Sequence, residues 1–160
     1  MTTTTTERPR GDAETILKGE LVSMIVAGQL VGIPVDTVQD ILGAQRITPV
    51  PMAAREVAGV LNLRGRIVTA INLRRRLGIP DDPEAGPAEM SVVVAHEGEL
   101  YSFLIDQVGE VLTPPADRFE RDVVSLSPAW RDVATGIFRL EGQLLVLLDV
   151  GRVLQFDRQS

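Results

Sequence analysis

Hydrophobic and polar residues alternate over short stretches along most of this 160-residue chain, as they do in β-strands that bury one face. Val31, Ile33 and Val35, for example, fall on one side of such a stretch. Glycine, proline and acidic residues separate neighbouring stretches and are typical of turns. The pattern predicts ten strands, at residues 20–27, 29–35, 38–42, 57–63, 66–71, 90–96, 99–105, 108–113, 134–140 and 143–149.

A segment near the middle of the chain returns in a weaker form near its end. Residues 57–78, VAGVLNLRGRIVTAINLRRRLG, align with residues 134–155, ATGIFRLEGQLLVLLDVGRVLQ, when Gly65 is placed on Gly142. Both copies predict a strand, a glycine turn, an apolar strand and one short helix. The two helices are expected at Leu73–Leu77 and Val150–Leu154. Such a repeat indicates a fold that is built twice.

The ends of these helices carry their own signals. Asn72 is expected to cap the first helix, and Gly78 to end it in the left-handed conformation. Asp149 aligns with Asn72 in the second copy. The uninterrupted apolar run Leu144–Leu148 predicts a strand that is buried on both faces.

A second pair of blocks supports the duplication. Residues 29–42 align with residues 99–112 without a gap, and acidic positions agree between them. We therefore predict an all-β fold of two five-stranded barrels with short helices, because closed barrels leave no exposed strand edges. The approximate halves are 18–80 and 90–156, joined by a polar, proline-rich linker at 79–89.

The remaining segments connect or precede the predicted strands. Residues 1–15 are rich in threonine and predict a disordered tail, 43–56 predict an irregular loop, and 114–132 form a long connector. A tight turn at Gly28-Gln29 should join the first two strands, and Asp36 should cap a short helical turn.

Composition narrows the class of function. The chain has no cysteine, no apolar run long enough to span a membrane and no secretory signal, which favours a cytoplasmic protein. The net charge of −6 and the few aromatic residues disfavour a general nucleic-acid binder. His96 is the only histidine and is expected at the surface. No catalytic motif is present, so we expect no enzyme, no cofactor and no metal site.

Five arginines and no acid lie between Val57 and Gly78. Arg64 stands at a hairpin tip, where it could contact a carboxylate of a partner or pair internally with Asp40; both interpretations stay open. Its counterpart in the second copy is Glu141. Arg74–Arg76 are interpreted as a solvated helix face. The alternative function is a nucleic-acid-binding barrel that uses the Arg64–Arg76 patch.

The segment Gly59–Gly78 resembles the signature of the CheW family, the adaptor proteins of bacterial chemotaxis arrays. The matching positions are Asn62, Leu63, Arg64, Gly65, Asn72, Leu73 and Arg74. Upstream, Val38–Leu42 resembles the family's V-x-E-[IV] stretch, with Asp40 in place of the usual Glu. The resemblance implies two SH3-like five-stranded barrels within one CheW-like domain at residues 16–156.

The same resemblance implies a function. The protein would link the signalling tip of a methyl-accepting chemoreceptor to the histidine kinase CheA, whose regulatory domain would be its second partner. It would reach the membrane only through the receptors. A related system, such as surface motility, stays open. On this resemblance the partner-binding residues are Val38, Asp40, Asn62, Leu63, Arg64 and Gly65.

Overall fold

The computed structural model describes residues 19–84, 86 and 88–156, so the tail predicted at residues 1–15 lies outside the described part. Its strands are β1 (Leu21–Val26), β2 (Gln29–Pro34), β3 (Val38–Leu42), β4 (Val57–Leu63), β5 (Arg66–Asn72), β6 (Met90–His96), β7 (Glu99–Ile105), β8 (Gln107–Leu112), β9 (Phe119–Glu120), β10 (Ala134–Leu140) and β11 (Gln143–Leu148). Its helices are η2 (Val35–Thr37), α2 (Leu73–Arg76), η3 (Ala116–Arg118), α3 (Pro128–Val133) and α4 (Val150–Val153). All ten predicted strands are present.

Two local predictions are wrong, and the long connector 114–132 holds short elements that were not predicted. These elements are η3, β9 and most of α3, which are too short to show a periodic pattern. The first hairpin turns at Ala27-Gly28, where both φ angles are positive, one residue before the predicted turn. Asp36 lies inside η2 and does not cap it, since Pro34 is the N-cap residue.

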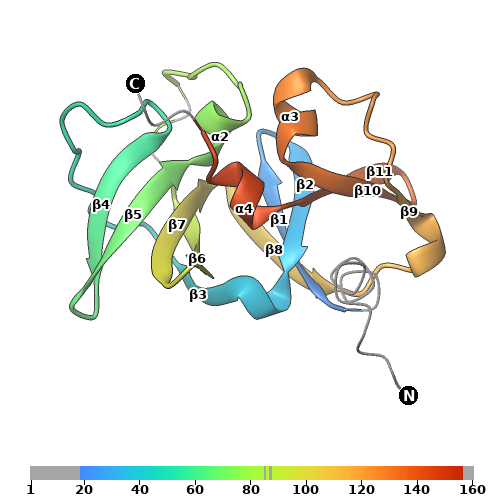
Figure 1. The fold of residues 1–160 in the computed structure, drawn as a ribbon, viewed down its shortest axis with the longest axis horizontal. Coiled ribbons are helices and arrows are strands. Elements are labelled where there is room, and N and C mark those ends of the chain that lie inside the picture. Colours follow the sequence, from blue (N-terminus) through green and yellow to red (C-terminus); the bar gives the residue numbers. More distant parts are fainter. Residues whose placement is uncertain (1–18, 85, 87, 157–160) are drawn as a thin grey trace.

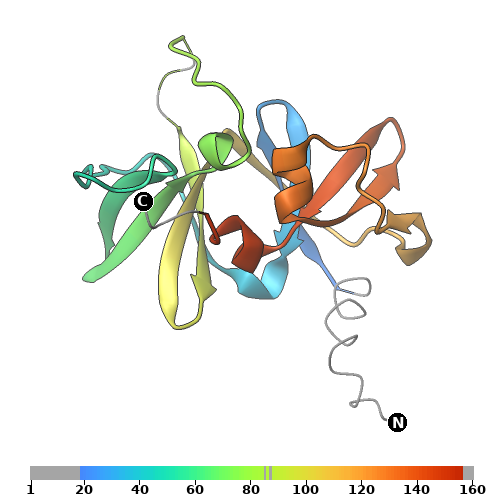
Figure 2. The same ribbon diagram turned by 45° about the horizontal axis from the view of Figure 1, so that its top comes forward.

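The strands form two sheets that lie side by side. The six-stranded sheet, which we call barrel A, has the order β8-β1-β2-β11-β10-β9, and the five-stranded sheet, barrel B, has the order β3-β6-β7-β5-β4. Figure 1 shows barrel B on the left and barrel A on the right, with α4 in red between them. The same separation is visible when the molecule is turned (Figure 2).

The two barrels do not follow the two halves of the sequence. Barrel A combines β1 and β2 of the first half with β8 to β11 of the second, and barrel B combines β3 to β5 with β6 and β7. The halves 18–80 and 90–156 therefore exchange their first hairpins. Parallel pairing of β2 with β11 and of β5 with β7 joins each exchanged hairpin to its new sheet.

The sheet orders confirm the duplication. By the repeat, β1, β2, β3, β4 and β5 correspond to β6, β7, β8, β10 and β11, respectively. Exchanging each strand for its counterpart converts the order β3-β6-β7-β5-β4 of barrel B into β8-β1-β2-β11-β10, which is the order found in barrel A. Even β9 has a counterpart. Its Glu120 pairs with Ile137, and the isolated bridge Thr48–Val60 occupies the equivalent place in barrel B. Each unit is thus a five-stranded SH3-like barrel closed by a further short segment.

The ends of α2 and α4 agree with the repeat as well. The side chain of Asn72 accepts a hydrogen bond from the backbone N–H of Arg75, and Asp149 accepts one from Arg152. Gly78 follows α2 with a φ of 74°, which an L side chain adopts only with strain. The predicted cap of α2 at Asn72 and its end at Gly78 are confirmed, and Asp149, which aligns with Asn72, caps α4.

The core has one central cluster and one smaller cluster inside each barrel. The central cluster draws on both barrels and on α2, α3 and α4. Strand β11 contributes to two of them, because Leu145 and Leu147 point into barrel A whereas Val146 and Leu148 join the central cluster. This two-sided burial is what the apolar run predicted. Among the described residues, every helix is too short to cross a membrane.

Candidate functional site

The tip of the β4–β5 hairpin is shaped by its own residues. Arg64 and Gly65 have φ angles of 51° and 85°, which is the type I′ geometry that matches the twist of a hairpin. The side-chain oxygen of Asn62 accepts a hydrogen bond of 2.9 Å from the backbone N–H of Gly65. Asn62 and Gly65 therefore fix the turn on which Arg64 is carried.

Arg64 reaches across to β3. Its Nη2 donates a hydrogen bond of 2.8 Å to Oδ2 of Asp40, so the internal pair considered from the sequence is present. The Arg64 side chain is nevertheless 73% exposed, which leaves guanidinium N–H groups accessible to a partner. The bond from Arg64, together with the backbone N–H of Ile41, lowers the pKa of Asp40. The carboxylate is therefore charged at neutral pH.

The six predicted site residues fall into two groups. Asp40, Asn62, Arg64 and Gly65 come together at the surface of barrel B. Val38 and Leu63 are half-buried: Val38 packs against the central core cluster, and Leu63 against the cluster inside barrel B.

Two exposed apolar residues near the Asp40–Arg64 pair were not identified from the sequence. Ile41 follows Asp40 on β3 and is 41% exposed, and Ile67 pairs with Asn62 across the hairpin and is 66% exposed. Ile41 stands two residues after the exposed Gln39 on β3, so the alternation of that strand predicts exposure at its position. For Ile67 the alternation gives no such signal, because Ile71 on the same strand face is buried. We call the Asp40–Arg64 pair and the hairpin tip that carries it the hairpin surface, and Ile41 and Ile67 are exposed on the strands next to it.

The equivalent surface of barrel A has a different charge. Glu110 and Val111 of β8 take the places of Asp40 and Ile41, and Glu141 takes the place of Arg64. Val111 is exposed like its counterpart. The two barrels therefore share an architecture but present a basic tip on one side and an acidic tip on the other.

The arginines of α2 are not a solvated face. Arg74 donates two hydrogen bonds, of 3.1 and 2.8 Å, to the carboxylate of Asp106, and Arg75 donates two of 3.1 Å to Asp81. Both side chains are about one-third exposed. These pairs neutralise two of the five arginine charges between Val57 and Gly78, and Asp40 offsets a third at Arg64, so a nucleic-acid-binding patch is not favoured.

Arg76 has a structural place of its own. Its side chain is only 8% exposed and donates two hydrogen bonds of 2.8 Å to the backbone oxygens of Arg152 and Val153. Carbonyls at a helix end lack partners within the helix, and a cation there also suits the helix dipole. Arg76 thus joins α2 to the end of α4.

No arrangement typical of a bound metal is found within residues 19–84, 86 and 88–156, where no three His, Asp or Glu side chains gather closely enough. His96 is partly exposed, and its Nε2 lies 3.7 Å from a carboxylate oxygen of Glu97. The chemistry of the described surface is therefore that of charge pairing and apolar contact.

The fold consists of two SH3-like barrels that exchange their first hairpins, and the β4–β5 hairpin of barrel B carries an Asn-Leu-Arg-Gly turn. These features define a CheW-like domain. The family model for the CheW-like domain matches residues 20–158, so the chain belongs to the CheW family. The chemotaxis protein CheW of Thermotoga maritima is 29% identical over 144 residues, which cover 89% of this chain and 92% of that protein.

Other similar proteins are more distant. The chemotaxis protein CheW of Bacillus subtilis is 26% identical over 141 residues, covering 88% of each chain. Protein PilI of Pseudomonas aeruginosa is 27% identical over 121 residues, which cover 76% of this chain and 67% of PilI. The crystal structure of the scaffolding protein TtCheW from Thermoanaerobacter tengcongensis superimposes with a TM-score of 0.77 at 20% identity, over 88% of this chain and 94% of that one.

Proposed function

We propose that this chain is a non-enzymatic adaptor, which couples methyl-accepting chemoreceptors to the histidine kinase CheA in a bacterial chemosensory array. Membership of the CheW family and similarity to several proteins named chemotaxis protein CheW support this role. In it the protein works in the cytoplasm and reaches the membrane only through receptors. Its partners are the receptor signalling tip and the regulatory domain of CheA.

The observation that carries the proposal is the Asp40–Arg64 pair at the hairpin surface. A guanidinium that is already oriented by one carboxylate loses less side-chain entropy when it binds another. Arg64 can keep its single bond to Asp40 and offer its remaining donors to an acidic group of a partner. Ile41 and Ile67 add apolar area beside it, as a docking surface needs.

The difference between the barrels suits a bridge between two proteins. A partner with an acidic group fits the tip that carries Arg64, whereas the tip that carries Glu141 repels it. The two barrels can therefore bind different proteins although they share one architecture. If the affinity for one partner depends on the state of the other, the adaptor couples the two.

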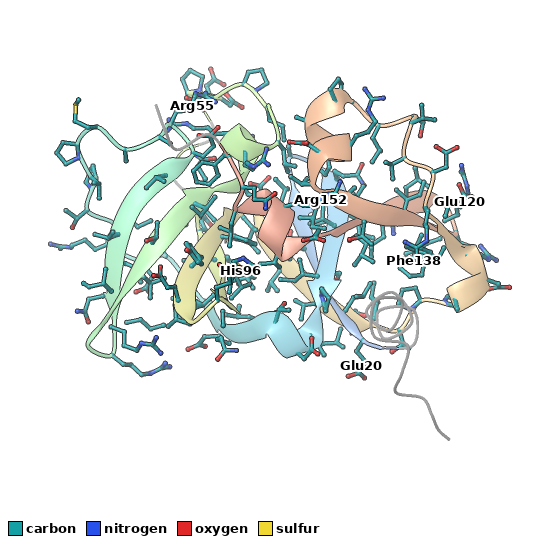
Figure 3. All side chains as sticks on the ribbon, viewed as in Figure 1. Glu20, Arg55, His96, Glu120, Phe138 and Arg152 are labelled. Atoms are coloured by element: carbon teal, nitrogen blue, oxygen red, sulfur yellow. The ribbon has the colours of Figure 1, made fainter. Side chains whose placement is uncertain are left out.

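The test measures binding to a receptor signalling fragment and, separately, to the regulatory domain of CheA. Arg64→Glu should weaken one of the two complexes by about tenfold or more, since that corresponds to the loss of one charge-assisted contact. Arg55→Glu is the matched control, because Arg55 is an exposed arginine elsewhere on the same half of the molecule (Figure 3). Failure of the wild-type protein to bind either partner at micromolar concentrations would overturn the proposal.

A further inference from the structure

Two surface cavities occupy equivalent places in the repeat. One, the α4 cavity, has a volume of about 460 Å³, and the other, the α2 cavity, about 880 Å³. Five lining positions of the α4 cavity correspond by the repeat to lining positions of the α2 cavity. The pairs are Pro34 and Leu104, Val35 and Ile105, Asp36 and Asp106, Asp149 and Asn72, and Gly151 and Arg74. The same depression is thus built twice.

The α2 cavity contains a guanidinium supplied by the chain itself. Nε and Nη2 of Arg74 donate to the two carboxylate oxygens of Asp106, at 3.1 and 2.8 Å. Asp106 Oδ2 also accepts a hydrogen bond of 2.8 Å from the backbone N–H of Ala27. A bidentate pair of this kind is the geometry in which arginine recognises a carboxylate most specifically.

The α4 cavity has the carboxylate but not the arginine. By the repeat, Asp36 corresponds to Asp106 and Gly151 to Arg74, although Asp36 lies in η2 and Asp106 between β7 and β8. Among the described residues, no lysine or arginine side chain bonds to the Asp36 carboxylate. The space that a side chain at position 151 would enter borders His96, whose Cε1 lies 3.2 Å from a Cβ built on the glycine. Figure 3 shows His96 beside α4.

The remaining walls suit a long cationic side chain. Glu20 and Asp149 add negative charge near Asp36, although Asp149 Oδ1 is already engaged as the cap of α4. Pro34, Val35, Leu148 and Val150 supply apolar surface. The methylene groups of an arginine can pack on such a surface while its charged end meets the carboxylates.

We propose that the α4 cavity binds the side chain of an arginine supplied by a partner protein, with Asp36 as the carboxylate that receives it. The partner's guanidinium takes the place that Arg74 fills in the other copy of the repeat. Arginine is favoured over lysine because its planar fork matches the bidentate arrangement already present at Asp106. The proposal does not depend on the hairpin surface, which lies on other residues.

An NMR titration tests it. Amide signals of the ¹⁵N-labelled protein are followed while N-acetyl-arginine-methylamide is added, and the neutral isostere N-acetyl-citrulline-methylamide serves as the reference. We expect saturable shifts at residues 36, 96 and 151, with a dissociation constant in the millimolar range and at least about tenfold weaker binding of citrulline. Free L-arginine, whose charged ends are absent from a protein chain, should bind no more tightly than the capped form.

Variants make the outcome decisive. Asp36→Asn should weaken arginine binding by about tenfold, whereas Asp117→Asn, at an exposed acid outside the cavity, should leave it unchanged. Gly151→Arg should supply the missing guanidinium within the chain and abolish the response, and Gly151→Ala should retain it. The Asp36→Asn result decides the matter even if Gly151→Arg does not fold.

Three outcomes would overturn the proposal: no saturable shift at about 50 mM arginine derivative, equal binding of citrulline, or full binding by Asp36→Asn. Tighter binding of free L-arginine would overturn its assignment to a partner's side chain. None of these results bears on the complexes that test Arg64, so the two proposals fail independently.

Discussion

Asp40 of β3 and Arg64, in the turn that follows β4, are joined by a hydrogen bond of 2.8 Å, although β3 and β4 stand at opposite ends of the barrel B sheet order. The pair therefore has two possible consequences, because it ties β3 to the β4–β5 hairpin and it also orients an exposed guanidinium. Exposed ion pairs contribute little to stability, since water screens them and two long side chains must be ordered. We infer that orientation is the more important consequence.

A charge reversal separates these consequences. In the double variant Asp40→Arg, Arg64→Asp the internal pair is kept but its polarity at the hairpin tip is inverted. We expect a melting temperature close to that of the wild type and a loss of partner binding as large as in Arg64→Glu. Recovery of partner binding in the double variant would mean that the pair serves only to tie β3 to the β4–β5 hairpin and does not orient Arg64 for a partner.

Lowering the pH should destabilise the fold, because Asp106 becomes protonated. The hydrogen bonds from Arg74 are the main reason why the pKa of Asp106 is lowered, and the backbone N–H of Ala27 adds to them. A lowered folded pKa means that the charged carboxylate stabilises the fold above the unfolded pKa of about 3.9, and that this contribution is lost as the pH falls toward the folded pKa. Asp106→Asn should therefore be less stable than the wild type at pH 7, by about 1 to 2 kcal/mol, and the difference should shrink below about pH 4.

Urea denaturation at a series of pH values measures this difference. Asp117→Asn is a suitable control, because Asp117 is exposed and makes no ion pair among the described residues. A constant difference between Asp106→Asn and the wild type from pH 7 to pH 3 would contradict the expectation.

The duplication could be predicted because its markers are local. The glycine turns at Gly65 and Gly142 and the caps Asn72 and Asp149 depend on the conformation of a few consecutive residues. The exchange of the β1–β2 and β6–β7 hairpins could not, since both hairpins present similar apolar faces and either could pair with β5 or β11. Only the packing of the whole chain decides between these pairings.

The candidate site also has features that could be predicted from the sequence and features that could not. The Asp40–Arg64 pair could be named as one of two alternatives from charge and position alone. The role of Arg76 could not, because it bonds to backbone oxygens of Arg152 and Val153, and a backbone group leaves no mark in the sequence. The α4 cavity could not be predicted either, because the residues that line it come from distant parts of the chain.

Gly59 should tolerate no side chain. Its φ is 151°, and a Cβ built there would lie 2.2 Å from the backbone oxygen of Thr48, in the segment that closes barrel B. Gly59→Ala must move that backbone, so we expect a loss of at least about 3 kcal/mol in the free energy of unfolding. Gly65→Ala is the matched control: it meets nothing within 4 Å and should cost only about 1 to 2 kcal/mol for its positive φ. Equal losses in chemical denaturation would show that the close approach to Thr48 is unimportant.

Barrel B should gain stability when a buried hydroxyl is removed. The hydroxyls of Ser91 and Ser102 are buried and, within the described part of the chain, lack a hydrogen-bond partner. An unpaired buried hydroxyl costs about 1 to 3 kcal/mol, so Ser102→Ala should raise the free energy of unfolding by about 1 kcal/mol. Ser23→Ala in barrel A should do the opposite, because Ser23 Oγ donates a hydrogen bond of 2.7 Å to the backbone oxygen of Glu110. Chemical denaturation of both variants compares the same atomic deletion in the two barrels, and a loss of stability in Ser102→Ala would mean that its hydroxyl is bonded in solution.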